Sequence, residues 1–170
     1  MDMIEGKIVK LRGLKKEDKA LIYEWVNRKD LRDKMGTVWP VSECEHEQWF
    51  ENMCLSKEPK IFAIEFEGRC IGTIGLKEFD RVNGNVEMYV RIGDDSARGK
   101  GCGRDAVVAM SDYCFDHLNF HKTYMHVHAS NETAIRCYEA AGFTCEGCLK
   151  EHNFVNGHYE DVLVMGRIKK

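Results

Sequence analysis

The chain has 170 residues, of which 44% are apolar, and 25 basic against 28 acidic residues give a formal net charge of −3. This length and apolar content suit one folded domain spanning residues 1–170. The slightly acidic balance argues against a nucleic-acid-binding protein, which usually carries a basic face. No run of about 18 apolar residues is present, so we expect no membrane segment. Eight cysteines without a signal-peptide pattern indicate free thiols and a cytoplasmic protein.

The first part of the chain predicts one strand and two helices. A strand is expected over residues 7–12, a helix over 16–27, and irregular structure over 30–40. Ser42 and Glu45 have the spacing of a capping box, which predicts the start of a second helix. The apolar residues that this second helix is expected to turn inward are Trp49, Phe50 and Met53.

The middle of the chain predicts an antiparallel meander. Turn residues, including Asn83-Gly84, separate three stretches of strand-forming residues. These stretches are residues 60–67, 70–79 and 85–92.

The last part of the chain predicts a change of architecture. A glycine-rich loop over residues 98–103 is followed by a helix, a strand, a second helix and two more strands around the hairpin signal Asn156-Gly157. A strand, loop, helix and strand in that order form a βαβ unit, whose two strands run parallel. We therefore predict an α/β fold with a mixed, mostly antiparallel sheet of about seven strands and helices on both faces.

The glycine-rich loop is the clearest functional signal. Gly99, Gly101 and Gly103 leave backbone N–H groups accessible just before a helix, where a pyrophosphate binds well. A nucleotide-binding P-loop is excluded because Lys100 is followed by Gly101 rather than by Ser or Thr. A dinucleotide-binding loop is disfavoured because Arg104 occupies the position of its third glycine.

Two motifs about 30 residues apart resemble those of the GNAT superfamily of N-acetyltransferases. The loop from Arg98 to Gly103 is similar to the R/Q-x-x-G-x-G/A motif of that family. The segment with Asn131, Ala134, Tyr138 and Gly142-Phe143 resembles its N-x-x-A-x-x-x-Y-x-x-x-G-F motif. Further similarities at both ends of the chain point to the branch that contains ribosomal-protein and spermidine acetyltransferases.

The resemblance implies that acetyl-CoA is the co-substrate, and we expect no metal cofactor. It also implies which residues contact CoA, with the strand residues acting through their backbone groups. These residues are Val90, Arg91, Ile92, Arg98, Gly99, Lys100, Gly101, Cys102, Gly103 and Asn131. Asn131 is equally suited to be a helix N-cap.

The resemblance further implies two catalytic residues. Tyr138 is expected to protonate the departing CoA thiolate, although the residues alone favour a core tyrosine. Glu87 is the candidate general base, acting through water, with a solvated glutamate at a strand end as the alternative.

The acceptor is the least determined part of the prediction. Glu43, Glu47 and Glu51 form an acidic stripe, which is either a solvated helix face or an aid in collecting a cationic amine such as a polyamine. The expected partner is thus a small-molecule or peptide amine. The alternative acceptors are the N-terminus of a protein, including a ribosomal protein, and an amino sugar. An acyl-CoA-binding domain without turnover is a further alternative, and the oligomeric state stays open, with a homodimer among the options.

Two groups of potential metal ligands are given other interpretations. His126 and His128 share one side of a strand, but two histidines make a poor metal site. Cys145 and Cys148 form a single CxxC, whereas a metal site usually has a second pair. We interpret the histidines as strand surface and the cysteines as unligated strand thiols.

Overall fold

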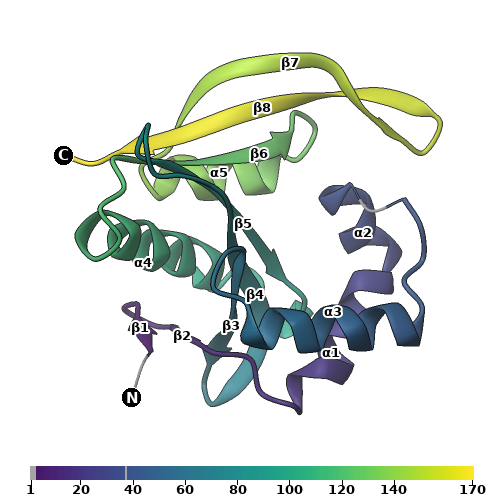
Figure 1. Ribbon diagram of the computed structural model, residues 1–170. Helices are drawn as coiled ribbons and strands as arrows, with labels where there is room; N and C mark the ends of the chain where they lie inside the picture. Colours follow the sequence, from purple (N-terminus) through teal and green to yellow (C-terminus); the bar gives the residue numbers. More distant parts are fainter. Residues whose placement is uncertain (1–2, 37) are drawn as a thin grey trace.

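The computed structural model describes residues 3–36 and 38–170, and one eight-stranded sheet runs through them in the order β1-β2-β3-β4-β5-β6-β8-β7 (Figure 1). Its first five strands pair antiparallel with one another. They are β1 (Ile4–Glu5), β2 (Lys10–Arg12), β3 (Lys60–Phe66), β4 (Arg69–Asp80) and β5 (Asn85–Ile92). The predicted meander is therefore confirmed, close to its expected bounds.

The predicted change to a parallel pair is also confirmed. β5 and β6 (Lys122–His128) are parallel and are connected through a short 3-10 helix, η1 (Asp95–Ala97), and α4 (Cys102–Asp116). The sheet ends with β8 (His158–Ile168) and β7 (Thr144–Val155), which form an antiparallel hairpin. The mixed, mostly antiparallel sheet thus has one strand more than predicted, because the two-residue β1 is too short to produce a sequence pattern.

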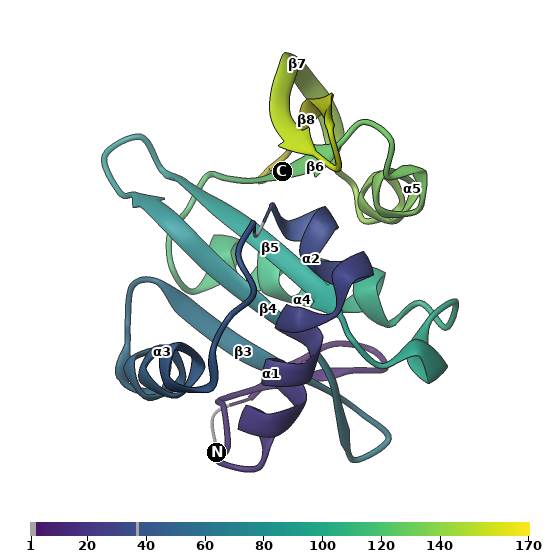
Figure 2. The ribbon, with the colours of Figure 1, turned by 90° about the vertical axis from the view of Figure 1, so that its right-hand side faces the viewer.

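Helices cover both faces of the sheet, as predicted (Figure 2). The larger apolar core lies between the sheet, α4 and α5 (Glu132–Ala140), and Met88, Met110 and Phe143 are buried in it. A smaller core packs α1 (Asp18–Asn27), α2 (Lys29–Met35) and α3 (Glu43–Leu55) against the other face. Its buried members are Ile22, Trp25, Leu31 and Phe50.

Two local predictions were wrong. Residues 30–40 were expected to be irregular, but α2 forms there; it is short and polar, and it ends at Gly36, which has a left-handed φ of 71°. The capping box of α3 is confirmed, yet Trp49 is 36% exposed rather than inward. His46 takes that inward position because its ring nitrogen bonds to the backbone oxygen of Lys19 at 2.9 Å.

A buried ion-pair network joins the start of the chain to the sheet. The Arg12 guanidinium donates to both carboxylate oxygens of Asp18, at 2.8 and 3.0 Å, and to Glu65 at 2.7 Å. Arg12 and Asp18 are almost fully buried. The network fixes β2, β3 and the first turn of α1 relative to one another.

None of the helices in the described part of the chain is long and apolar enough to cross a membrane.

Candidate active site

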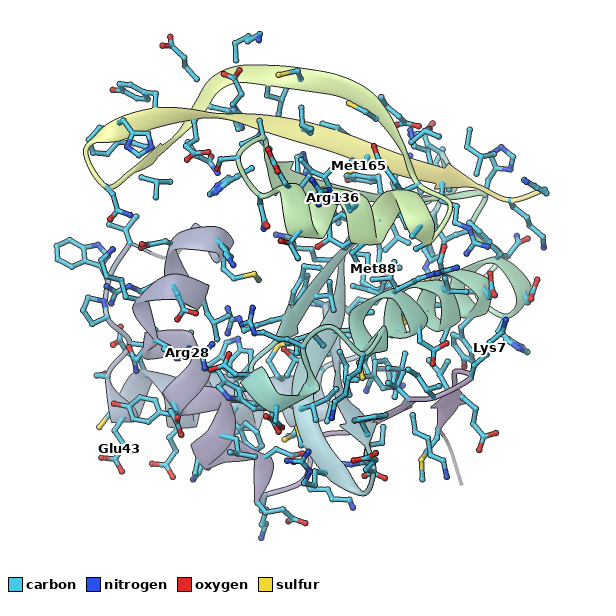
Figure 3. All side chains as sticks on the ribbon, turned by 180° about the vertical axis from the view of Figure 1, so that it is seen from behind. Lys7, Arg28, Glu43, Met88, Arg136 and Met165 are labelled. Carbon is cyan, nitrogen blue, oxygen red and sulfur yellow. The ribbon has the colours of Figure 1, made fainter. Side chains whose placement is uncertain are left out.

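A cavity of about 830 Å³ opens where β5 and β6 separate. The two strands pair only from Asn85–Lys122 to Glu87–Tyr124, although β5 continues to Ile92. Figure 3 shows Met88 on β5 and Arg136 on α5 on opposite sides of the separation, and both residues line the cavity. Beyond Glu87, the edge of β5 therefore presents backbone N–H and C=O groups that β6 does not pair. An extended ligand with amide groups can pair with such an edge, as an added strand does.

The glycine-rich loop forms one end of the cavity. Gly99 and Gly101 have φ values of 73° and 81°, which favour glycine, and Gly101 is the N-cap of α4. Because Gly101 has no side chain to cap the helix, the N–H groups of its first turn keep free hydrogen-bonding capacity. A Cβ at Gly101 would approach only Ile8 Cδ1, at 4.0 Å. The loop thus leaves an open, donor-rich approach that suits a diphosphate.

Cationic side chains surround this loop. Arg98 is held by Asp95, whose carboxylate accepts from Nε at 2.9 Å, and by the backbone oxygen of Ile92 at 3.1 Å. Arg104 of α4 and Arg136 of α5 also line the cavity. The cavity therefore combines the helix N–H donors of the loop with three guanidinium groups.

Tyr138 enters the cavity from α5. The helix begins at its N-cap Asn131, whose Oδ1 accepts from the N–H of Ala134 at 3.3 Å. Tyr138 is 8% exposed and its ring lies 6.4 Å from that of Phe143, centre to centre. Burial raises the pKa of the Tyr138 phenol, which keeps it protonated at neutral pH. A neutral phenol at the cavity wall is a proton donor.

Glu87 and His126 form a hydrogen-bonded pair across the separating strands. His126 Nδ1 lies 2.8 Å from Glu87 Oε1, and Lys77 Nζ lies 3.7 Å from the same oxygen. Glu87 is 8% exposed, so it is not a solvated strand end. When the carboxylate accepts a hydrogen bond from Nδ1–H, the unprotonated nitrogen of His126 is Nε2. The lone pair on Nε2 can then accept a proton.

Most of the residues predicted from the sequence line this one cavity. They are Glu87, Val90, Arg91, Ile92, Arg98, Gly99, Gly101, Cys102, Gly103, Asn131 and Tyr138. Lys100 is not among the lining residues, and its Nζ lies 5.9 Å from the centre of the Phe66 ring. The side chain of Cys102 is buried in the apolar core, which leaves its backbone as the part that faces a ligand.

The acidic stripe on α3 is separate from the cavity. Glu43, Glu47 and Glu51 are exposed, and none of the three lines it. Glu47 binds Lys19 Nζ at 3.0 Å. The hypothesis that this stripe collects a cationic acceptor therefore has no geometric support.

Sequence reasoning missed the residues on the acceptor side. α2 contributes Leu31, Lys34 and Met35 to the wall. His128 is 8% exposed and bonds to Asn153, so its interpretation as strand surface was wrong. The sequence does not show the register in which β5 and β6 pair. Glu87 pairs with Tyr124, and His126 shares a face of β6 with Tyr124, so this register brings His126 close to Glu87.

The turn between β7 and β8 is bonded to α2. Asn156 accepts from Lys29 Nζ at 2.8 Å and donates to Asp33 Oδ2 at 2.8 Å. These bonds tie the hairpin to α2.

No group of three potential metal ligands is found among residues 3–36 and 38–170. Cys145 and Cys148 are exposed, free thiols on β7.

Comparison with known proteins agrees with this geometry. The sequence profile of the acetyltransferase (GNAT) domain matches residues 9–144. The spermidine N(1)-acetyltransferase of Vibrio cholerae is 31% identical over 153 residues, covering 89% of this chain and 88% of its own. The Escherichia coli K12 enzyme of the same name is 29% identical over 157 residues, covering 92% and 84%.

A solved structure has a closely similar fold. It is the V. cholerae spermidine N-acetyltransferase in complex with CoA and spermine, which is 30% identical, with a TM-score of 0.86 and coverage of 94% of this chain and 95% of that one. This chain belongs to the GNAT acetyltransferase family and is an acetyl-CoA-dependent N-acetyltransferase.

Proposed function

We propose that the chain transfers the acetyl group of acetyl-CoA directly to a primary amine, with Tyr138 as general acid and the Glu87–His126 pair receiving the proton of the amine. One observation carries the proposal: a single cavity contains the donor-rich loop, the unpaired edge of β5, the buried phenol and the hydrogen-bonded pair. The diphosphate of CoA would bind at the N-terminus of α4, and its amide-containing arm would lie along β5.

The reaction requires two proton transfers besides the loss of the ammonium proton to the surroundings. The amine must first be neutral, and for an alkylammonium with a pKa of about 10.4 this costs about 4.6 kcal/mol at pH 7. Its nitrogen then attacks the thioester carbonyl carbon, and the C–S bond breaks as the tetrahedral intermediate collapses. His126 Nε2 takes the proton from nitrogen, while the Tyr138 hydroxyl gives one to the departing sulfur. Exchange with water restores both side chains.

Polyamines are the first acceptors to test. Two relatives are spermidine N(1)-acetyltransferases by name, and one structure was solved with spermine. A polyamine is rich in primary and secondary alkylammonium groups, so it needs proton removal more than a peptide α-amine with a pKa near 7.8. His126, hydrogen-bonded to the buried Glu87, is the group that would remove the proton.

A thiol-release assay with acetyl-CoA tests the proposal. The panel contains spermidine, spermine, N-terminal peptides, amino sugars and simple alkylamines, and mass spectrometry identifies the acetylated product. We expect CoA release that depends on an added primary amine. Tight acetyl-CoA binding without turnover of any amine would instead support a binding domain and refute the proposal.

A further inference from the structure

The charges that line the cavity do not match a purely cationic acceptor. Six lysines and arginines line it, and Glu87 is the one carboxylate among the lining residues of the described chain. The six are Lys34, Lys77, Arg91, Arg98, Arg104 and Arg136. Arg98 and Arg104 flank the glycine loop, where the phosphates of CoA would neutralise them, and Arg136 on α5 lies 3.5 Å from Glu132. The first three need another explanation.

Arg91 lies on the acceptor side of the sheet. Its register partner on β4 is Thr73, and Glu87 is paired in the same way with Lys77, so the two side chains project from the same face of β5. The alternate residues Val86, Met88, Val90 and Ile92 pack toward the core under α4. Arg91 therefore points away from the helix that presents the phosphate-binding loop.

The Arg91 guanidinium is poorly compensated. Its Nε is buried and has no hydrogen-bond partner in the described structure. Burial lowers the pKa of Arg91, which reports the cost of holding this charge away from water. A buried, unpaired donor of a charged group is costly, and an anionic ligand that accepts from it recovers that cost.

The other cations on this face differ in their surroundings. Lys77 lies 3.7 Å from Glu87, so its charge is largely offset. Lys34, on α2, adds a positive charge to the wall beside Leu31. The acceptor side is thus divided into a Glu87–His126 end, which receives an amine, and an Arg91 end, which carries excess positive charge.

We infer that Arg91, with Lys34, forms a subsite for an anionic group on the acceptor, so that the preferred substrate is a primary amine that also carries a carboxylate or a phosphate. The inference rests on the proposed amine acetylation and refines its substrate class. Glu87 and Arg91 are four residues apart on one strand, about 13 Å, which is the scale of an extended small molecule or a dipeptide. A polyamine would place further positive charge against Arg91, and this unfavourable contact gives discrimination.

Three acceptors of equal length test the inference. ε-Aminocaproate, hexylamine and hexamethylenediamine have the same chain and end in a carboxylate, a methyl group and a second ammonium. An aminoalkyl phosphate distinguishes a phosphate subsite from a carboxylate subsite. We expect kcat/KM for the best anionic acceptor to exceed that for the diamine by at least about tenfold, a ratio worth about 1.4 kcal/mol.

The variants assign this preference to Arg91. In Arg91→Gln, the ratio of kcat/KM for the anionic acceptor to kcat/KM for the diamine should fall at least about tenfold, mainly through a higher KM for the anionic acceptor. Arg91→Lys should restore part of this preference. Arg81→Gln is the matched control, because it removes an exposed guanidinium that does not line the cavity. A wild type that prefers the diamine, or a ratio that is the same in Arg91→Gln, would overturn the inference.

A binding measurement separates this inference from the proposed reaction. Calorimetry follows ε-aminocaproate and the aminoalkyl phosphate binding to CoA-loaded protein, without any turnover. Binding that weakens in Arg91→Gln supports the subsite even if no amine is acetylated. If neither compound shows Arg91-dependent binding, the subsite does not exist, whatever the outcome with spermidine.

Discussion

Tyr138 is a neutral phenol that its helix places at the cavity wall. Its helix holds the ring against Phe143, while the cavity wall includes its hydroxyl-bearing side chain. Burial raises the pKa of the phenol, so Tyr138 stays protonated and can give a hydrogen bond or its proton to the sulfur as negative charge develops there. The thiolate leaves into the same water-poor surroundings, which raise its basicity as well.

Tyr138→Phe tests this role. The ring and its packing remain, but the proton donor is lost, so kcat should fall at least about tenfold, given the usual 10²–10⁴-fold contribution of general acids. Acetyl-CoA affinity, measured by calorimetry, and Tm should change little. A phenylalanine variant with near-normal kcat across the pH range would show that Tyr138 is a packing residue.

His126→Gln tests the other end of proton transfer. An amide cannot take up a proton at neutral pH, so kcat/KM should fall at least about tenfold at pH 7. Activity should recover as the pH rises, because more of the acceptor is then already neutral. His121→Gln is the control, since this exposed histidine does not line the cavity. An unchanged pH profile in His126→Gln would remove His126 from the mechanism.

Glu87 is a positioning residue in this scheme. It holds the Nδ1 proton of His126 and thereby fixes which nitrogen faces the cavity. Its nearest cationic neighbour is Lys77 on β4, and Tyr124 packs edge-on against the imidazole from β6. Glu87→Gln should therefore alter the same limb of the pH profile as His126→Gln, by a smaller factor.

At the scale of elements, the sequence predicted the loop and the parallel pair because both have local signals. Glycines at alternate positions and the order strand–loop–helix–strand define the phosphate-binding end. The acceptor side has no such signal. α2 is short and polar, and it is placed by bonds from Lys29 and Asp33 to Asn156, more than 120 residues away. The pairing of His126 with Glu87 likewise depends on a register that the sequence does not show.

Gly101→Val tests the loop as an element. The added side chain would occupy the open space before α4, so CoA binding should weaken at least about tenfold, about 1.4 kcal/mol. Gly101 has a left-handed φ of 81°, so any side chain there strains the backbone. The control variant must introduce the same backbone strain. Gly68→Val is that control, because Gly68 has a φ of 75° in the turn between β3 and β4 and does not line the cavity.

Comparison of the two glycine variants isolates the ligand effect. Both should lose similar stability in thermal melts, while only Gly101→Val should lose CoA affinity in calorimetry. Equal CoA affinities in the two folded variants would show that the diphosphate binds elsewhere.

At the scale of the whole molecule, firm pairing of β5 with β4 is needed so that β5 can separate from β6 without the sheet coming apart. β5 is paired with β4 along its length, but with β6 only through Glu87. The buried Arg12 network anchors the opposite edge, because it joins β2 and β3 to the start of α1. The cavity is thus supported by interactions that do not touch it.

Asp18→Asn tests this support. Burial raises the pKa of Asp18, but hydrogen bonds from Arg12 and from the Lys15 N–H outweigh it, so the folded pKa lies below the ordinary value. The carboxylate therefore stabilises the fold above the unfolded pKa of about 3.9, and this contribution is lost as the pH falls toward the folded pKa. Breaking a buried pair costs about 3 kcal/mol, or roughly 9 °C in Tm for a chain of this size.

Thermal melts at several pH values give the measurement. At pH 7, Asp18→Asn should melt well below the wild type, and the difference should shrink as the pH falls below about 4 toward the lowered pKa of the folded carboxylate. Glu47→Gln removes an exposed partner of Lys19 and should shift Tm by at most about 1 °C, since such pairs contribute little. If Asp18→Asn melts like Glu47→Gln at pH 7, the Arg12 network does not hold the sheet together, and the rigidity of the cavity must come from the apolar cores alone.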